Sequence, residues 1–342
     1  MFLFCLFVLV FSGARSEEGD LGYNLNIGYA IDLFANYGDL GQVTRVVSSD
    51  YEDRDDGNDG PAEPFNEKNI RIFANATSSE TISNVIDDNM SLLFCDTFEE
   101  LLEYYFKDFS IEGLSQPWKA FMGDWIPEEI MRTLGIEYNP ASENCCFVLA
   151  KLSKSHRTVK MDNLTGQVAV KEYVKRAIND LDYNDDAKMR RFMENYGTHY
   201  INSYVTGNFI YQVFKYKRVG YNLLKAYMRK GRSKTQPDNL RFYFSSYFLQ
   251  NVGDIRIASG NKTIEAWARH NLRDSQYLYS RPSLMRLYYN HVLVYKLNQL
   301  LDNGALLAMN LKTLKPIFQD RRKGDKFEEI IENDLLLWEV NA

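Results

Sequence analysis

The chain has 342 residues, of which 45% are hydrophobic, and its formal net charge is −6. This hydrophobic content is enough for a sizeable core, so it excludes a chain that stays disordered throughout. The negative charge argues against a general nucleic-acid binder, which is usually strongly basic, and no nucleic-acid partner is predicted.

The N-terminus predicts export. Met1 to Phe11 is an unbroken apolar run, and three small residues follow it at positions 12 to 14. This pattern is typical of a secretory signal peptide cleaved after Ala14 or Ser16, although no Lys or Arg precedes the run. The run is too short to span a bilayer, which takes about 20 residues. We therefore expect a signal peptide over 1–16 and one exported, extracellular domain over 17–342.

Export gives meaning to the glycosylation sequons and the cysteines. Asn-x-Ser/Thr triplets predict at least one N-linked glycan on a surface loop, and they begin at Asn75, Asn89, Asn163 and Asn261. After signal removal Cys95, Cys145 and Cys146 remain, an odd number in an oxidising compartment. One disulfide is expected, from Cys95 to either member of the vicinal pair. No CxxC pair or HExxH motif indicates a metal, and no cofactor is predicted.

The first half of the chain predicts loops, short helices and one apolar strand. The acidic, Pro- and Gly-rich stretch 50–68 is expected to be a flexible loop, with a calcium site as the less favoured alternative. Residues 98–106 predict a helix, and 114–135 predict short helices because two prolines interrupt them. Residues 147–152 form a compact apolar run that indicates a strand.

Two helices and a long strand are expected next. An apolar stripe at i, i+3, i+4 spacing predicts the clearest helix of the chain, and its members are Val170, Tyr173, Val174, Ala177, Ile178 and Leu181. A second short helix, with Phe192 on its apolar side, is expected to end at Tyr196-Gly197. Residues 198–217 are rich in β-branched and aromatic residues and predict a strand.

The last third of the chain alternates between both kinds of element. Residues 218–234 are basic, with apolar residues at helical spacing. Residues 240–249 and 280–297 predict strands from their aromatic and β-branched content, and a helix is expected around Trp267. A helix is also expected near the C-terminus. No internal repeat or linker is apparent, which favours one large domain.

The junction between the second helix and the long strand carries the most specific motif. Its members are Tyr196, Gly197, Thr198, His199 and Tyr200, followed after six residues by Gly207. Gly197 lets the chain leave a helix in a left-handed conformation, and Gly207 lets a strand bend sharply. This cluster resembles the signature of the MACPF (membrane-attack-complex/perforin) family. Asn208 replaces the second glycine of the family's Gly pair, and asparagine tolerates left-handed geometry.

The resemblance, over about residues 21–315, implies an α+β fold. It is the MACPF/CDC-like bent, twisted, four-stranded antiparallel sheet flanked by helical clusters near 98–145 and 218–249. Within the family the chain is similar to small secreted members that act in development. That likeness implies a non-enzymatic signalling factor that promotes activation of a receptor tyrosine kinase. Its expected partner is an extracellular ligand or receptor of that pathway.

A pore-forming immune or lytic effector is the alternative function. As a membrane strand, 219–229 would place Lys225 and Arg229 on one face, at a cost of about 2 to 4 kcal/mol each near the midplane. Pro117 and Pro127 interrupt the first cluster. A pore is therefore disfavoured.

The basic segment is a candidate surface for an anionic membrane, matrix glycan or acidic partner, with an ordinary solvated helix face as an equal alternative. Its cations are Arg218, Lys225, Arg229, Lys230, Arg232 and Lys234. No enzyme is predicted, because GxSxG, P-loop and HExxH motifs are absent. We expect His199 to have a structural hydrogen-bonding role.

Overall fold

The fold is taken from a computed structural model, which describes residues 27–34, 72–73, 77–83, 85–86, 90–121, 127–137, 145–162, 169–231, 237–273, 281–288 and 290–341. Several predicted features lie outside the described residues: the signal peptide, the acidic loop 50–68, the sequons Asn75, Asn89 and Asn163, and the cations Arg232 and Lys234. In the part of the chain that is described, no helix has the length and apolarity to span a membrane.

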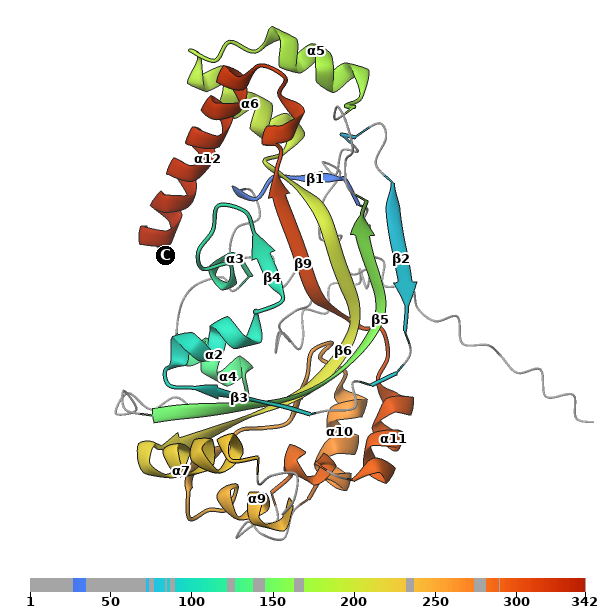
Figure 1. Ribbon diagram of the computed structural model, residues 1–342, viewed down its shortest axis with the longest axis vertical. Helices are drawn as coiled ribbons and strands as arrows, with labels where there is room; N and C mark the ends of the chain where they lie inside the picture. Colours follow the sequence, from blue (N-terminus) through green and yellow to red (C-terminus); the bar gives the residue numbers. More distant parts are fainter. Residues whose placement is uncertain are drawn as a thin grey trace, which may run out of the picture.

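Two long antiparallel strands form the centre of the sheet. They are β5 (Cys145–Met161) and β6 (His199–Lys217), and they pair from Cys145↔Lys217 to Lys160↔Ser203. Both strands run along the long axis of the molecule and then curve through a pronounced bend (Figure 1). A bulge between Ser155 and Arg157 interrupts the register opposite Gly207. Such a bulge bends a strand and increases its local twist.

Shorter strands complete the sheet on both sides. On the outer edge of β5 lie β2 (Ser78–Ile82) and β3 (Ser91–Cys95). On the far edge of β6 lie β9 (Ala305–Thr313), β8 (Arg256–Ile257) and β7 (Leu249–Val252), all antiparallel to it. β1 (Ala30–Ile31) pairs with the start of β6, and β4 (Phe109–Ile111) pairs with β9 in parallel. The predicted α+β fold class is confirmed. Of the four long strands that were expected, only β5 and β6 are continuous, and β4 adds a strand that is parallel to β9.

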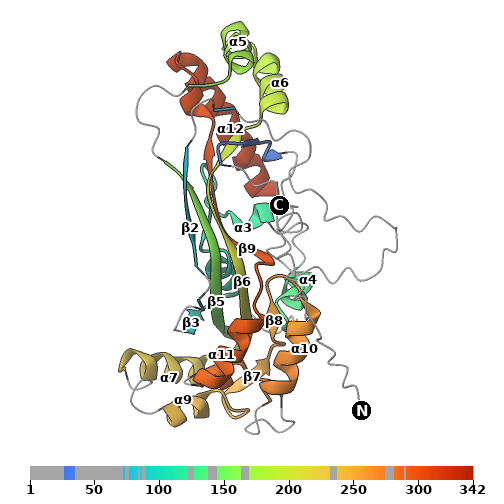
Figure 2. The ribbon, with the colours of Figure 1, turned by 90° about the vertical axis from the view of Figure 1, so that its right-hand side faces the viewer.

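Three groups of helices cover this sheet (Figures 1 and 2). α5 (Glu172–Asp180), α6 (Asp186–Tyr196) and α12 (Arg321–Asn341) gather at one end of the long axis. α2 (Phe98–Tyr105), α3 (Trp118–Phe121) and α4 (Pro127–Thr133) lie on the inner side of the bend. α7 (Arg218–Arg229), α9 (Pro237–Tyr243), α10 (Lys262–Asn271) and α11 (His291–Leu300) cover the opposite face at the other end.

Two hydrophobic cores lie on the two faces of the sheet. In β5, Phe147 and Leu149 belong to the core that includes α2, whereas Val148 and Ala150 belong to the core that includes α7, α9 and α10. This strand is buried on both faces up to residue 152, which explains its continuous apolar run. Beyond that point burial gives way to partial exposure.

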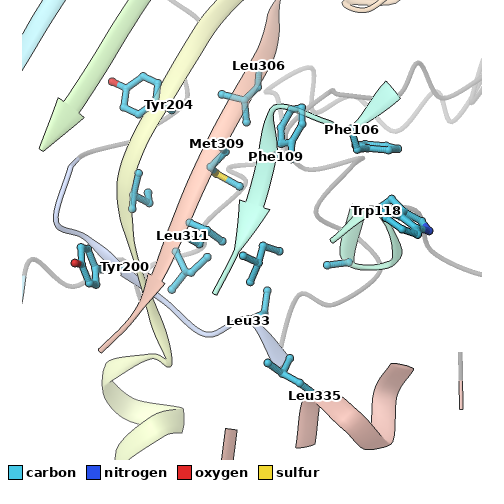
Figure 3. Close-up of a cluster of buried hydrophobic side chains, with 14 of the residues drawn as sticks. Leu33, Phe106, Phe109, Trp118, Tyr200, Tyr204, Leu306, Met309, Leu311 and Leu335 are labelled. Carbon is cyan, nitrogen blue, oxygen red and sulfur yellow. The ribbon is translucent and has the colours of Figure 1, made fainter. Parts of the chain in front are cut away.

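The larger core continues to the far end of the molecule. Figure 3 shows its side chains gathered between β9, β4, α3 and α12, with Leu33 close to Leu335. Met309 and Leu311 of β9 contribute from the sheet and are almost completely buried. The segment after β1 and the C-terminal helix are therefore packed into the same core.

Two predicted strands are helices in the structure. Residues 240–249 contain the end of α9 and a turn, and only from Leu249 do they join β7. Residues 280–297 contain the 3-10 helix η3 (Leu284–Leu287) and most of α11. The aromatic and β-branched content favoured strands, but burial follows a helical period, as at Leu297 and Leu301.

Candidate functional site

The motif around Gly197 forms the corner between α6 and β6. α6 begins after Asp185, whose carboxylate accepts the Lys188 N–H at 3.1 Å. It ends at Tyr196, and Gly197 adopts a φ of 89°. A Cβ on Gly197 would lie 2.7 Å from the Ile31 carbonyl oxygen. Glycine is therefore required both by its left-handed conformation and by the close approach of the β1 backbone.

His199 is completely buried at this corner, and both ring nitrogens have partners. Nε2 lies 3.0 Å from the Glu112 carbonyl oxygen, and Nδ1 lies 3.0 Å from Thr198 Oγ1. Because a carbonyl oxygen only accepts, Nε2 carries the proton, and Nδ1 of the neutral ring accepts from the Thr198 hydroxyl. Burial lowers the pKa of His199 to about 4, so the ring is neutral at pH 7.

Hydrogen bonds from this corner join segments that are far apart in the chain. Thr198 Oγ1 accepts the Leu33 N–H at 3.1 Å, and the Thr198 N–H donates to the Ile31 carbonyl at 2.8 Å. The Glu112 carboxylate accepts both the N–H and the hydroxyl of Thr313, at 2.7 and 3.2 Å. The corner thereby connects the ends of β1, β4 and β9 to the start of β6.

The two tyrosines of the motif pack beside the corner on separate elements. Tyr196 stacks on Tyr173 of α5 at 6.4 Å between ring centroids and contacts Phe192 of α6 at 4.8 Å. Tyr200 meets Phe73 edge to face at 4.9 Å. The contacts of Tyr196 thus join α5 to α6, and the contact of Tyr200 packs Phe73 against the start of β6.

Gly207 lies where the β5 backbone comes too close to β6 to leave room for a side chain. A Cβ there would collide with the Lys154 carbonyl oxygen and would lie 2.8 Å from Leu307 Cδ1. The bulged residue of β5, His156, lies opposite this position, and the backbone nitrogen of His156 would be 3.1 Å from the same Cβ. Glycine at position 207 therefore permits the bulge and the bend.

Asn208, which replaces the second glycine of the family pair, is fully buried. Its Nδ2 donates to Ser259 Oγ at 2.8 Å and to Asp302 Oδ1 at 2.6 Å. Its Oδ1 accepts the Phe209 N–H at 3.0 Å and the Ser259 N–H at 3.3 Å. The amide thus ties the bend of β6 to the loops that precede α10 and β9.

Two further side chains, which were not predicted from the sequence, connect the central strands β5 and β6 to the part of the chain between β7 and the end of α11. Gln212 donates to the Gly253 and Pro282 carbonyls at 2.7 and 3.1 Å and accepts the Leu284 N–H at 2.7 Å. Lys154 donates to two carbonyls at the C-terminus of α11 at 2.9 and 2.8 Å, where a cation is favoured. Their partners are tens of residues or more away, so no local motif would have identified them.

The predicted basic surface is only partly neutralised. Lys225 and Arg218 approach Asp96 at 3.3 and 3.7 Å. Arg229 and Lys230, at the end of α7, are exposed and form no ion pair with a described residue. The structure therefore separates the described cations into two bound to Asp96 and two facing solvent.

The three cysteines in the described residues, Cys95, Cys145 and Cys146, are buried thiols, and the expected disulfide does not join them. Cys95 lies directly opposite Phe147 in the β3–β5 register, and Cys146 points to the other core. Burial raises the pKa of Cys95 to about 12, which keeps the thiol protonated. Among the residues with assigned positions, no group of His, Cys, Asp and Glu is arranged to hold a metal ion.

Asn261, the one sequon with a described asparagine, caps the N-terminus of α10. Its Oδ1 accepts the Thr263 and Ile264 N–H groups at 3.0 and 3.3 Å. Its Nδ2, the atom to which a glycan is attached, donates to Asp302 at 3.2 Å. The capping oxygen is thus separate from the atom that a glycan would modify.

Comparisons with known proteins identify only distant structural likenesses. No family model matches the sequence, and no curated protein matches it. The fold is similar to GNIP1Aa from Chromobacterium piscinae, with a TM-score of 0.43 and 8% identity over 91% of this chain and 57% of that one. It is also similar to a putative cell invasion protein with a MAC/Perforin domain from Bacteroides thetaiotaomicron. That likeness has a TM-score of 0.37 and 10% identity over 92% of this chain and 63% of the other.

A third likeness is to Astrotactin-2, described as a perforin-like membrane protein involved in neuronal development. Its TM-score is 0.32, with 11% identity over 75% of this chain and 38% of that one. The chain therefore spans less than two thirds of each of these structures. Perforin-like proteins are thus among its structural neighbours, and at these TM-scores no activity follows from the likeness.

Proposed function

We propose that this protein is a secreted, non-enzymatic MACPF-type factor in extracellular developmental signalling, resembling the insect protein Torso-like. In this proposal it promotes localised activation of the Torso receptor tyrosine kinase during terminal patterning. It acts by binding a ligand or receptor of that pathway, or a membrane or matrix surface. No chemical step is assigned to it.

The corner at residues 196–208 is the observation that carries this proposal. The signature residues occupy the place where a helix passes into a bent central strand, and their side chains are used in packing and hydrogen bonding. His199 is buried and neutral, with both nitrogens engaged. These residues have a structural role, which fits a protein that acts by binding partners at its surface.

Receptor activation in cell culture tests the signalling role. Torso-expressing insect cells would receive limiting ligand with and without the secreted protein, and receptor tyrosine phosphorylation would be measured. We expect the protein to increase phosphorylation, and heat-denatured protein serves as the control. Equal phosphorylation with native and denatured protein would contradict the proposal.

A liposome-leakage assay with purified protein separates this function from the pore-forming alternative. We expect no release of an encapsulated dye, because the cations of α7 would be costly in a membrane strand. Robust release at concentrations that leave receptor phosphorylation unchanged would favour the lytic function instead.

A further inference from the structure

The end of the molecule formed by α7 and α9 exposes large apolar side chains. Val219 is 73% exposed, and Leu223, one turn further along α7, is 48% exposed. Phe242 and Tyr247 are 56% and 81% exposed. α7 and α9 lie at the lower extremity of the long axis (Figures 1 and 2).

The aromatic side chains at this end form one packed group centred on Phe248. Its ring lies 5.1 Å from Phe242, 5.4 Å from Tyr243 and 4.9 Å from Tyr247 between centroids. A Cβ on Gly220 of α7 would lie 3.1 Å from the Phe248 ring. The exposed aromatics of the α9 region therefore adjoin the first turn of α7 and are held in place by ring contacts.

Cations adjoin this apolar group, and only part of their charge is balanced by an acid. The segment 217–231 contains no Asp or Glu, and its cations are Lys217, Arg218, Lys225, Arg229 and Lys230. Asp96 neutralises part of the charge of Arg218 and Lys225. The other three are exposed and form no ion pair within the described part of the chain. In a chain of net charge −6, this end is locally positive.

We propose that the surface formed by Val219, Leu223, Phe242, Tyr247 and the flanking cations docks peripherally on an anionic lipid bilayer. Aromatic and aliphatic side chains enter the interface between headgroups and acyl chains, while Lys and Arg contact anionic headgroups. α7 and α9 remain helical, so docking needs no strand insertion. This inference rests on the membrane surface named in the proposed function, and its failure would leave the receptor-phosphorylation test unaffected.

The combination of chemistries favours lipid over a sulfated glycan. A glycan would use the cations alone, and it would leave the protruding aliphatic side chains of α7 in water. A bilayer interface contacts both kinds of group at once, and α7 and α9 lie at one end of the long axis (Figure 1), the end that can approach a planar membrane.

The exposed apolar side chains of α11 provide a matched control. Val292 and Tyr295 are 66% and 64% exposed, comparable with the α7–α9 surface. α11 carries only one Lys, Lys296, so its exposed apolar residues are not flanked by a cluster of cations on the same helix. Replacing them removes similar exposed apolar area at a different place.

Vesicle flotation with the purified secreted chain tests the proposal. Vesicles of phosphatidylcholine alone would be compared with vesicles that also contain phosphatidylserine, at low and high salt. We expect binding only with phosphatidylserine, and weakening by salt. The double variants Phe242→Ser/Tyr247→Ser and Arg229→Gln/Lys230→Gln should each lower the partition coefficient on the order of 10-fold. Val292→Ser/Tyr295→Ser should bind like the wild type.

The remaining outcomes would overturn the proposal. Equal binding to both kinds of vesicle, or unchanged binding by both surface variants, would contradict an anionic-lipid surface. Retention on heparin without vesicle binding would assign the cations to a glycan. Dye release during binding would indicate insertion rather than docking. Thermal melting of each variant checks that the substitutions leave the fold intact.

Discussion

The corner at residues 196–208 and the surface formed by α7 and α9 differ in the burial and the partners of their side chains. At the corner, Thr198, His199 and Asn208 are fully buried and each has hydrogen-bond partners. On the α7–α9 surface, aromatic rings and cations face solvent. The corner therefore holds the fold, whereas the surface is free to interact. Substitutions in the first region should change stability, and substitutions in the second should change binding alone.

The largest effect is expected at Gly207. The substitution Gly207→Val places a side chain against the Lys154 backbone, so the central strands must separate. We expect the free energy of unfolding to fall by about 3 kcal/mol or more, measured by chemical denaturation. Gly231→Ala is the control, since nothing lies within 4 Å of its Cβ and only its φ of 66° is strained. A similar loss in both variants would contradict the close-approach argument.

His199 should make stability depend on pH. Its pKa is about 4 in the folded protein, below the ordinary histidine value of about 6.5, so the unfolded chain takes up a proton first as pH falls. The contribution is present above pH 6.5 and is lost as pH falls to about 4, with a total of about 3 kcal/mol. Denaturation midpoints across this range provide the measurement.

The substitution His199→Phe should weaken that pH dependence and lower stability. It leaves the Glu112 carbonyl and the Thr198 hydroxyl without their ring partners, at a cost of about 2 to 3 kcal/mol at pH 7. His270→Phe, at an exposed position of α10, is the matched control. An undiminished slope in His199→Phe would show that another group titrates.

A smaller effect is expected from introducing glycine at position 208, where the MACPF signature has its second glycine. Asn208→Gly removes hydrogen bonds to Ser259 and Asp302 and adds backbone freedom. We expect a loss of about 2 kcal/mol, measured by thermal and chemical denaturation. An increase in stability would mean that the amide strains the bend rather than holding it.

The smallest effect is expected on the α7–α9 surface. Arg229→Gln/Lys230→Gln removes two exposed charges that have no partner among the described residues. We expect the free energy of unfolding to stay within about 0.5 kcal/mol of the wild type. A loss comparable to that of Asn208→Gly would make these residues structural and would weaken the contrast with the corner.

Elements whose signals are local could be predicted from the sequence. The apolar stripe of α5, the glycine that ends α6 and the β-branched content of β6 each depend on neighbours within a few residues, and the structure has all three. The fold class followed from the short motif at the α6–β6 corner. Its residues occupy the helix-to-strand position that the motif implies.

The rest depends on contacts between distant segments. The strand predictions at 240–249 and 280–297 were wrong because aromatic and β-branched residues also occur in helices packed on a sheet. The carboxylate of Glu112 meets Thr313, which is 201 residues away, and the amide of Asn208 meets Asp302. No spacing rule connects such pairs before the chain has folded.

The burial of β5 changes along its length, and this change predicts which substitutions each part of the strand tolerates. Up to residue 152 helices or strands cover both sides of the strand, whereas near its end Val159 and Met161 are buried while Thr158 and Lys160 are exposed. A saturation mutagenesis library should therefore accept almost no polar codons in the first part. In the last part it should accept them at every second position. The two parts of the same strand should therefore tolerate polar residues in different patterns.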